Sequence, residues 1–173
     1  MTATWVGVLA GYLHLLAVAT YVGGSIAMEV VLGPAQKFIP PAQAQVVAQR
    51  SADRFLILVW SSLALFPISG LLLFFSQSDQ SVGLFSTGFG RTLFTMMMLW
   101  VLLVINGAVI TFVLRPRLAN RAKSKGGAAA VAQRLETMQR AATQISWVTR
   151  VDLLVALFIV LLGASMAYGN GLL

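Results

Sequence analysis

The chain has no cysteine among its 173 residues. This absence excludes disulfide bonds, thiolate metal sites, covalent attachment of c-type haem and thiol redox chemistry. Charged residues are also scarce, at 10% of the chain, and the only histidine is His14. A bis-histidine haem site is therefore impossible within one subunit. Hydrophobic residues make up 58% of the chain and its mean hydropathy is +0.86, well above the level of a soluble domain.

The sequence also lacks the motifs of several functional classes. It contains no nucleotide-binding loop in a strand context, no zinc-ligand spacing and no nucleophile triad. A net charge of +7 suggests nucleic-acid binding in a soluble protein, but basic residues beside long apolar runs are topology signals. We therefore expect no nucleic-acid partner. The N-terminus lacks the basic stretch and cleavage site of a signal peptide, so we expect it to stay as the first helix.

Four uncharged apolar runs are long enough to cross a bilayer, which takes roughly 20 residues for a helix. They predict spans at approximately residues 4–31, 55–76, 91–114 and 148–170 of a single membrane domain, 1–173. Glu29 and the Gly33-Pro34 pair are expected to end the first span. The predicted fold is an all-α, integral membrane four-helix bundle surrounded by the lipid bilayer.

Basic residues are distributed unevenly along these spans. The first and third connections hold eleven of the twelve Lys and Arg residues, and only Arg91 falls on the other side. This asymmetry places those connections in the cytoplasm and both termini outside, in periplasmic or extracellular space. A prokaryotic plasma (inner) membrane is the simplest location. Helical extensions are expected on the cytoplasmic side at Ala42–Arg54 and Ala128–Arg150, with Lys123–Gly127 as a flexible linker.

His14 is the residue that most directly suggests chemistry. It lies about nine residues from Trp5, roughly 13 Å into the bilayer, on a face that includes Gly11 and Tyr21. An ionisable side chain at this depth is a functional hypothesis by default, and imidazole serves as a metal or haem ligand or as a proton carrier. The alternative is a neutral histidine hydrogen-bonded to a serine or a backbone carbonyl between helices.

The third span contains soft donor atoms in Met96, Met97 and Met98. Met96 is expected roughly 11 Å deep, close to the level of His14, but consecutive residues point about 100° apart on a helix. One or two of the three methionines at most can therefore face a site, and each is equally a packing residue. Arg91, at the mouth of this span, is a candidate for binding haem propionates or for anchoring the helix at the interface.

Four further intramembrane features have structural interpretations. Glu29 and Asp152 are expected in interhelical ion pairs with arginines at similar height, in preference to a proton path. Pro67 predicts a kink in the second span, and Asn106 predicts a polar contact between helices.

The first apolar run carries a family resemblance. Tyr12–Val18 and Tyr21–Gly24 resemble the first helix of the CopD-like (copper-resistance protein D) membrane family, which is similar in turn to the HemJ-type protoporphyrinogen oxidases. The resemblance continues in the later spans, at Arg54, Trp60, Ser69-Gly70-Leu71 and Thr87–Arg91.

The resemblance implies two cofactor chemistries. In HemJ-like proteins the first-helix histidine is associated with b-type haem, which implies haem at His14. Their functional third-helix lysine falls on or near Met96, a departure that weakens the transfer of oxidase activity. CopD-like proteins are linked to copper uptake, which implies copper as the alternative.

The main hypothesis is a b-type haem protein with a redox or electron-transfer role. His14 is its axial ligand, Met96 or Met97 the possible second ligand, and Arg91, Gly11 and Tyr21 further contacts. Protoporphyrinogen oxidation is the enzymatic form of this hypothesis. The alternatives are a copper-handling permease, in which His14 and Met96 bind the metal, and a non-catalytic subunit of a homo-oligomer or larger membrane complex.

Overall fold

The computed structural model describes residues 5–76, 85–116 and 128–168. Nearly all of these residues are helical, and no strand occurs among them. Four of the helices are long and apolar enough to cross a membrane: Trp5–Phe38, Val46–Ser76, Gly88–Leu114 and Thr143–Ala167. The predicted all-α membrane bundle is confirmed.

The first span is one helical run with changes of pitch. It consists of α1 (Trp5–Val18), the π-helix η1 (Ala19–Gly23), α2 (Gly24–Ile26), the π-helix η2 (Ala27–Leu32), α3 (Gly33–Ala35) and the 3₁₀-helix η3 (Gln36–Phe38). The Gly33-Pro34 pair does not end it, contrary to expectation. Pro34 sits in the first turn of α3, where its fixed φ suits a helix and its missing N–H costs little.

The other three spans are built from long helices. These are α4 (Pro41–Ser76), α5 (Gly88–Ala108) with the π-helix η4 (Val109–Leu114), and α7 (Ala128–Ala167). Both predicted helical extensions are present, since α4 begins at Pro41 and α7 at Ala128. Thr87 caps α5 by accepting a 3.0 Å hydrogen bond from the Gly90 N–H. The predicted linker Lys123–Gly127 lies outside the described residues.

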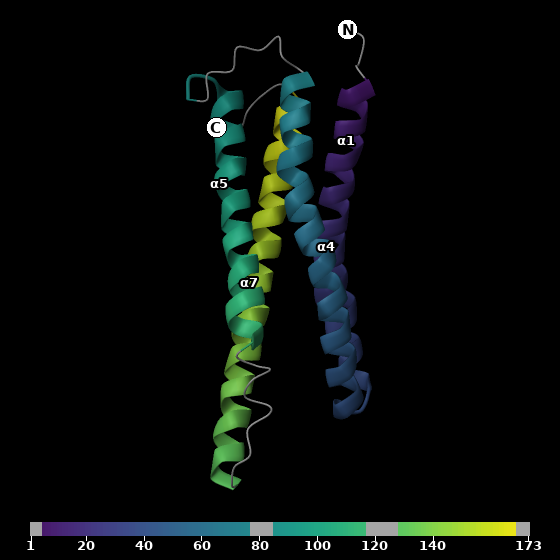
Figure 1. Cartoon of the computed structure of the whole chain (residues 1–173), viewed down its shortest axis with the longest axis vertical. Helices are drawn as coiled ribbons and strands as arrows, with labels where there is room; N and C mark the ends of the chain where they lie inside the picture. The colour runs from purple at the N-terminus through teal and green to yellow at the C-terminus, as the bar shows by residue number, and fades with distance from the viewer. Residues whose placement is uncertain (1–4, 77–84, 117–127, 169–173) are drawn as a thin grey trace.

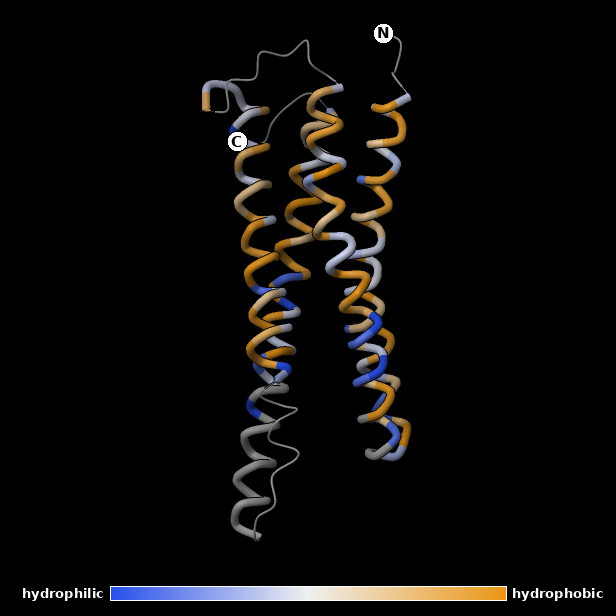
Figure 2. The backbone as a smooth tube through the Cα atoms, viewed as in Figure 1, coloured by the Kyte–Doolittle hydropathy of each residue, from blue (hydrophilic) through white to orange (hydrophobic). Residues whose placement is uncertain are grey.

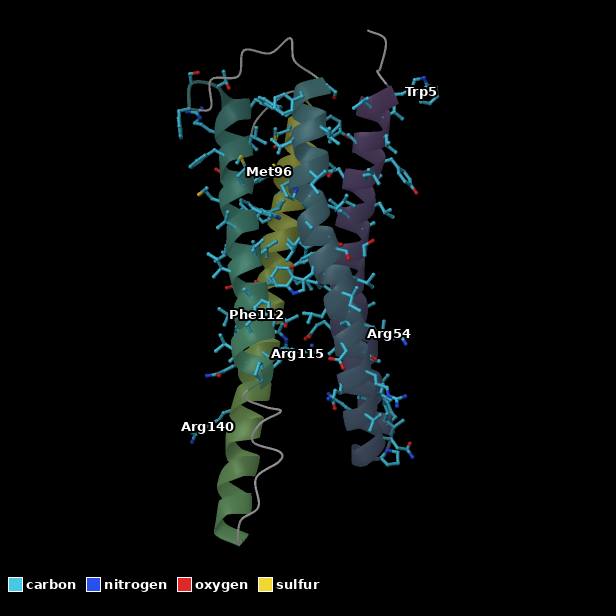
Figure 3. All side chains as sticks on the ribbon, viewed as in Figure 1. Trp5, Arg54, Met96, Phe112, Arg115 and Arg140 are labelled. Carbon is cyan, nitrogen blue, oxygen red and sulfur yellow. The ribbon has the colours of Figure 1, made fainter. Side chains whose placement is uncertain are left out.

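The spans pack as two helical hairpins. α1 lies along α4, and α5 lies along α7 (Figure 1). The hairpins come together at the end that holds Trp5 and Ala167, called here the Trp5 end. They diverge toward the opposite end, which lies beyond Arg115 and is called here the Arg115 end (Figure 3). The first described helix thus begins, and the last one ends, at the same side of the bundle. The assignment of that side to the outside of the cell stays a prediction.

A small core joins the hairpins and a large apolar surface surrounds it. The core takes one buried residue from each span: Tyr21, Leu63, Leu103 and Ala156. Large apolar side chains cover the outside, including Phe112 at 70% exposure. Figure 2 shows apolar residues along the helices and more polar ones toward the Arg115 end. Such a surface is unfavourable in water and matches hydrocarbon, as expected of a multi-pass membrane protein.

Candidate functional site

His14 is held by a serine from the second span. Its Nδ1 lies 2.9 Å from Ser69 Oγ, and Ser69 is fully buried. The Ser69 hydroxyl donates its single proton to the Leu65 carbonyl oxygen at 2.6 Å. When the hydroxyl donates to Leu65, Ser69 Oγ accepts from His14 Nδ1–H, because a hydroxyl has only one proton to give. In this arrangement the neutral ring carries its proton on Nδ1 and its lone pair on Nε2.

Three residues of α4 surround the imidazole because they share one helix face. Phe66, Ser69 and Gly70 are separated by steps of three and four residues, which brings them to the same side of the helix. The Phe66 ring meets His14 edge-on at a centroid distance of 5.7 Å. A Cβ at Gly70 would lie 3.7 Å from His14 Cε1, so the glycine allows the ring to approach the α4 backbone closely.

The serine hydrogen bond was the structural alternative offered for His14, and the structure contains it. That bond leaves the ligand hypothesis open, because it uses Nδ1 alone. Metal-binding histidines characteristically donate their second ring nitrogen to an oxygen, which fixes the tautomer and orients the ring. The arrangement at Ser69 therefore meets the requirement for an oriented ligand.

A second polar group lies further along the bundle and is connected to His14 through Phe66. The same phenylalanine meets Tyr21 at a centroid distance of 6.2 Å. Tyr21 is buried in the core and interacts electrostatically with Asp152 of α7. Asp152 is only 7% exposed, and its Oδ1 accepts a 2.7 Å hydrogen bond from Asn106 Nδ2 of α5. All four spans therefore contribute to the sequence of contacts from His14 to Asp152.

The predicted ion pairs are only partly present. Glu29 pairs with Arg150 at 2.6 Å, joining the first and fourth spans as expected. Asp152 was expected to pair with an arginine and instead bonds to the neutral amide of Asn106, which confirms the interhelical role predicted for that asparagine. A further ion pair, which was not predicted, joins Asp53 and Arg115 at 2.9 Å. The signal for it was two opposite charges at the same predicted end of neighbouring spans.

The methionines of the third span lie apart from the histidine contacts. The Met96 methyl group is 3.6 Å from the position that a Cβ of Gly163 would take, so Met96 packs against α7. His14 packs against α4. Met97 is 51% exposed on the outer surface of the bundle. Figure 3 shows Met96 on α5, toward the Trp5 end.

The remaining candidate residues have separate positions. Gly11 lies at the contact of α1 with α4, where an added Cβ would be 3.8 Å from Leu73 Cδ2. Arg91 is exposed at the start of α5. Of the residues that the sequence grouped with His14, Tyr21 is the one connected to it through a shared neighbour, Phe66.

The described part of the chain contains no group of three or more His, Cys, Asp or Glu residues able to hold a metal.

The chain matches the model of a known protein family. The family model described as copper resistance protein D matches residues 49–166. No curated protein and no solved structure matched the chain. The matched region begins in α4 and ends in α7, so it includes Ser69, Met96, Asn106 and Asp152, whereas His14 precedes it. Because the match extends over more than half of the sequence, the chain belongs to the copper resistance protein D family.

Proposed function

We propose that this chain handles copper within the membrane as a permease, and that His14 receives the ion as a transient ligand. The family match favours this alternative over the haem hypothesis, because the description of that family refers to copper. The observation that carries the proposal is the contact between His14 Nδ1 and Ser69 Oγ, which involves one ring nitrogen and leaves Nε2 as the metal donor. Imidazole is a suitable ligand for copper.

Ser69 supports this role as a positioning residue. Its hydroxyl orients the ring through Nδ1, and when it donates to Leu65 it favours the tautomer protonated on Nδ1. Removing a partner of this kind lowers metal affinity by roughly 10- to 100-fold in known metal sites. Ser69→Ala should therefore weaken copper binding while leaving the imidazole in place.

The thioether of Met96 is a second candidate ligand in this proposal. Thioether sulfur selects Cu⁺ in particular. Met96 packs toward α7 across the bundle from α1, so its participation requires the ion to move from His14 toward the second hairpin. Met98, two residues on and 49% exposed, is a matched control because it lies on the outer surface.

The test is copper uptake into proteoliposomes that contain the purified full chain, with Cu⁺ kept reduced by ascorbate. We expect His14→Ala to abolish uptake, Ser69→Ala and Met96→Leu to reduce it, and Met98→Leu to leave it unchanged. Uptake that is the same in wild type and His14→Ala would overturn the assignment of His14. Absence of copper uptake by well-folded wild type would overturn the permease proposal itself.

The haem hypothesis is tested on the same preparation. Visible absorption spectra with and without dithionite would show Soret and alpha bands if the chain binds haem, and those bands would disappear in His14→Ala. A coloured preparation without copper uptake would favour the redox hypothesis. A colourless preparation without uptake would favour the role of a non-catalytic subunit.

A further inference from the structure

Among the residues that the structure describes, no basic side chain pairs with the buried carboxyl of Asp152. Arg150, two residues earlier on the same helix, is bonded to Glu29. The group that donates to Asp152 is the neutral amide of Asn106. An anion in the hydrocarbon layer is costly unless a positive charge or a set of donors compensates it. A single hydrogen bond from a neutral group offsets little of the cost of a negative charge on a side chain that is only 7% exposed.

The other described titratable and charged groups near Asp152 do not supply the missing positive charge. The first span presents Tyr21, which carries no positive charge, and Glu29, which is bonded to Arg150. The third span presents Asn106, and its Arg115 is bonded to Asp53 of the second span. Arg150 and Arg115 are thus bonded to carboxylates other than Asp152.

We propose that Asp152, with Asn106 and Tyr21, forms a proton-binding site that exchanges its proton for the copper ion as copper passes through the bundle. The proton binds a carboxylate oxygen and gives a neutral carboxylic acid, while Asn106 keeps its hydrogen bond to Oδ1. When Cu⁺ reaches this level, the carboxylate compensates its charge and the proton leaves to water. One negative charge balances one cation at a time, so the two ions move in opposite directions. This exchange rests on the proposed copper function, whereas proton binding by Asp152 does not.

The position of the site along the bundle fits this exchange. Phe66 lies between His14 and Tyr21, in edge contact with both rings, and Tyr21 interacts electrostatically with Asp152. Copper that leaves His14 toward the Arg115 end must therefore pass the core at Tyr21 before it comes near Asp152. The His14 site and the Asp152 site are therefore connected through Phe66 and Tyr21, which allows an ion bound at one site to affect the other.

Proton binding can be measured without copper. The chain has five acidic residues, so infrared spectroscopy of the full chain in lipid nanodiscs can assign the carbonyl band of a protonated carboxyl by substitution. We expect a band that appears and disappears with pH, is lost in Asp152→Asn, and persists in Glu29→Gln and Asp53→Asn. Asp152→Glu keeps a carboxyl and should show a displaced band, which also controls for misfolding of Asp152→Asn. Absence of such a band, or its persistence in a folded Asp152→Asn, would overturn the proton site.

Exchange is tested in proteoliposomes that enclose a pH-sensitive dye. Uptake of Cu⁺ should raise the internal pH, and an acidic interior should speed uptake several-fold. Asp152→Asn should lose both effects, while Met98→Leu should keep them. Copper uptake without a pH change, or with internal acidification, would overturn the exchange. A wild type that takes up no copper but shows the infrared band would overturn the copper function and leave Asp152 as a proton site.

Discussion

The Trp100 indole nitrogen of the third span donates a 3.0 Å hydrogen bond to the backbone carbonyl oxygen of Leu63 in the second span. That carbonyl is the one whose intrahelical donor is missing, because the residue four positions later is Pro67. An unpaired carbonyl in the bilayer is expensive, and a side chain from a neighbouring helix is one of the ways to satisfy it. The bond also joins the two hairpins at the core.

This relationship predicts that Trp100 and Pro67 are energetically coupled. Trp100→Phe keeps an aromatic ring but removes the donor, and should lower the free energy of unfolding by about 1–3 kcal/mol beyond the packing loss. Pro67→Ala restores an N–H to bond Leu63, so the same substitution should cost less in that background. A double-mutant cycle on unfolding of the chain in detergent measures the coupling. Equal costs in both backgrounds would contradict it.

Gly24 is predicted to be intolerant of any side chain. A Cβ there would lie 2.6 Å from Phe55 Cε2, whereas one at the adjacent Gly23 would meet nothing within 4 Å. Gly24→Ala should therefore destabilise the chain by about 1–3 kcal/mol through overpacking. Gly23→Ala is the matched control and should be neutral or stabilising, because alanine is the better helix former.

A second substitution, at Phe55, is predicted to rescue part of the loss in Gly24→Ala. Phe55→Leu shortens the side chain that an alanine at position 24 would meet, so it should recover part of the stability in the Gly24→Ala background. Thermal unfolding of the four variants in detergent measures both effects. If Gly23→Ala and Gly24→Ala have the same melting temperature, the close packing of the first and second spans at Phe55 is refuted.

Asn106 is expected to stabilise the bundle through Asp152. Asn106→Leu leaves the buried carboxyl without its donor, at a cost of about 1–3 kcal/mol. Replacing both partners removes the polar groups together, and such a change can be nearly neutral. Asn106→Leu with Asp152→Leu should therefore be more stable than Asn106→Leu alone. An additive loss in the double variant would show that the hydrogen bond contributes little.

The orientation of the bundle is predicted from charge. Alkaline phosphatase fused to the C-terminus should be active and green fluorescent protein fused there dark, because eleven of twelve basic residues lie in connections assigned to the cytoplasm. A fusion placed after Arg54 should give the reverse result. Fluorescence from the C-terminal fusion would place that terminus inside and overturn the assignment.

The number of spans and the class of fold follow from the amino-acid sequence alone. Hydropathy and charge are properties of local segments, and the bilayer imposes helices on any apolar run of this length. The residue pattern also picked out His14, Asp152 and Asn106 as intramembrane polar groups. It placed the end of the first helix too early, because it treated Gly33-Pro34 as a stop, whereas helical geometry continues to Phe38.

The partners of these polar groups depend on how the helices pack in three dimensions. A helix turns about 100° per residue, so a small rotation of one span changes which neighbour a side chain meets. The predicted depths placed Met96 and His14 at a similar level of the membrane. In the structure, Met96 faces Gly163, and His14 faces Ser69, which is 55 residues further along the chain. The same geometry gave Asp152 an asparagine instead of an arginine. The position of a polar residue within its span sets its depth in the bilayer, and helix packing sets the direction in which its side chain points.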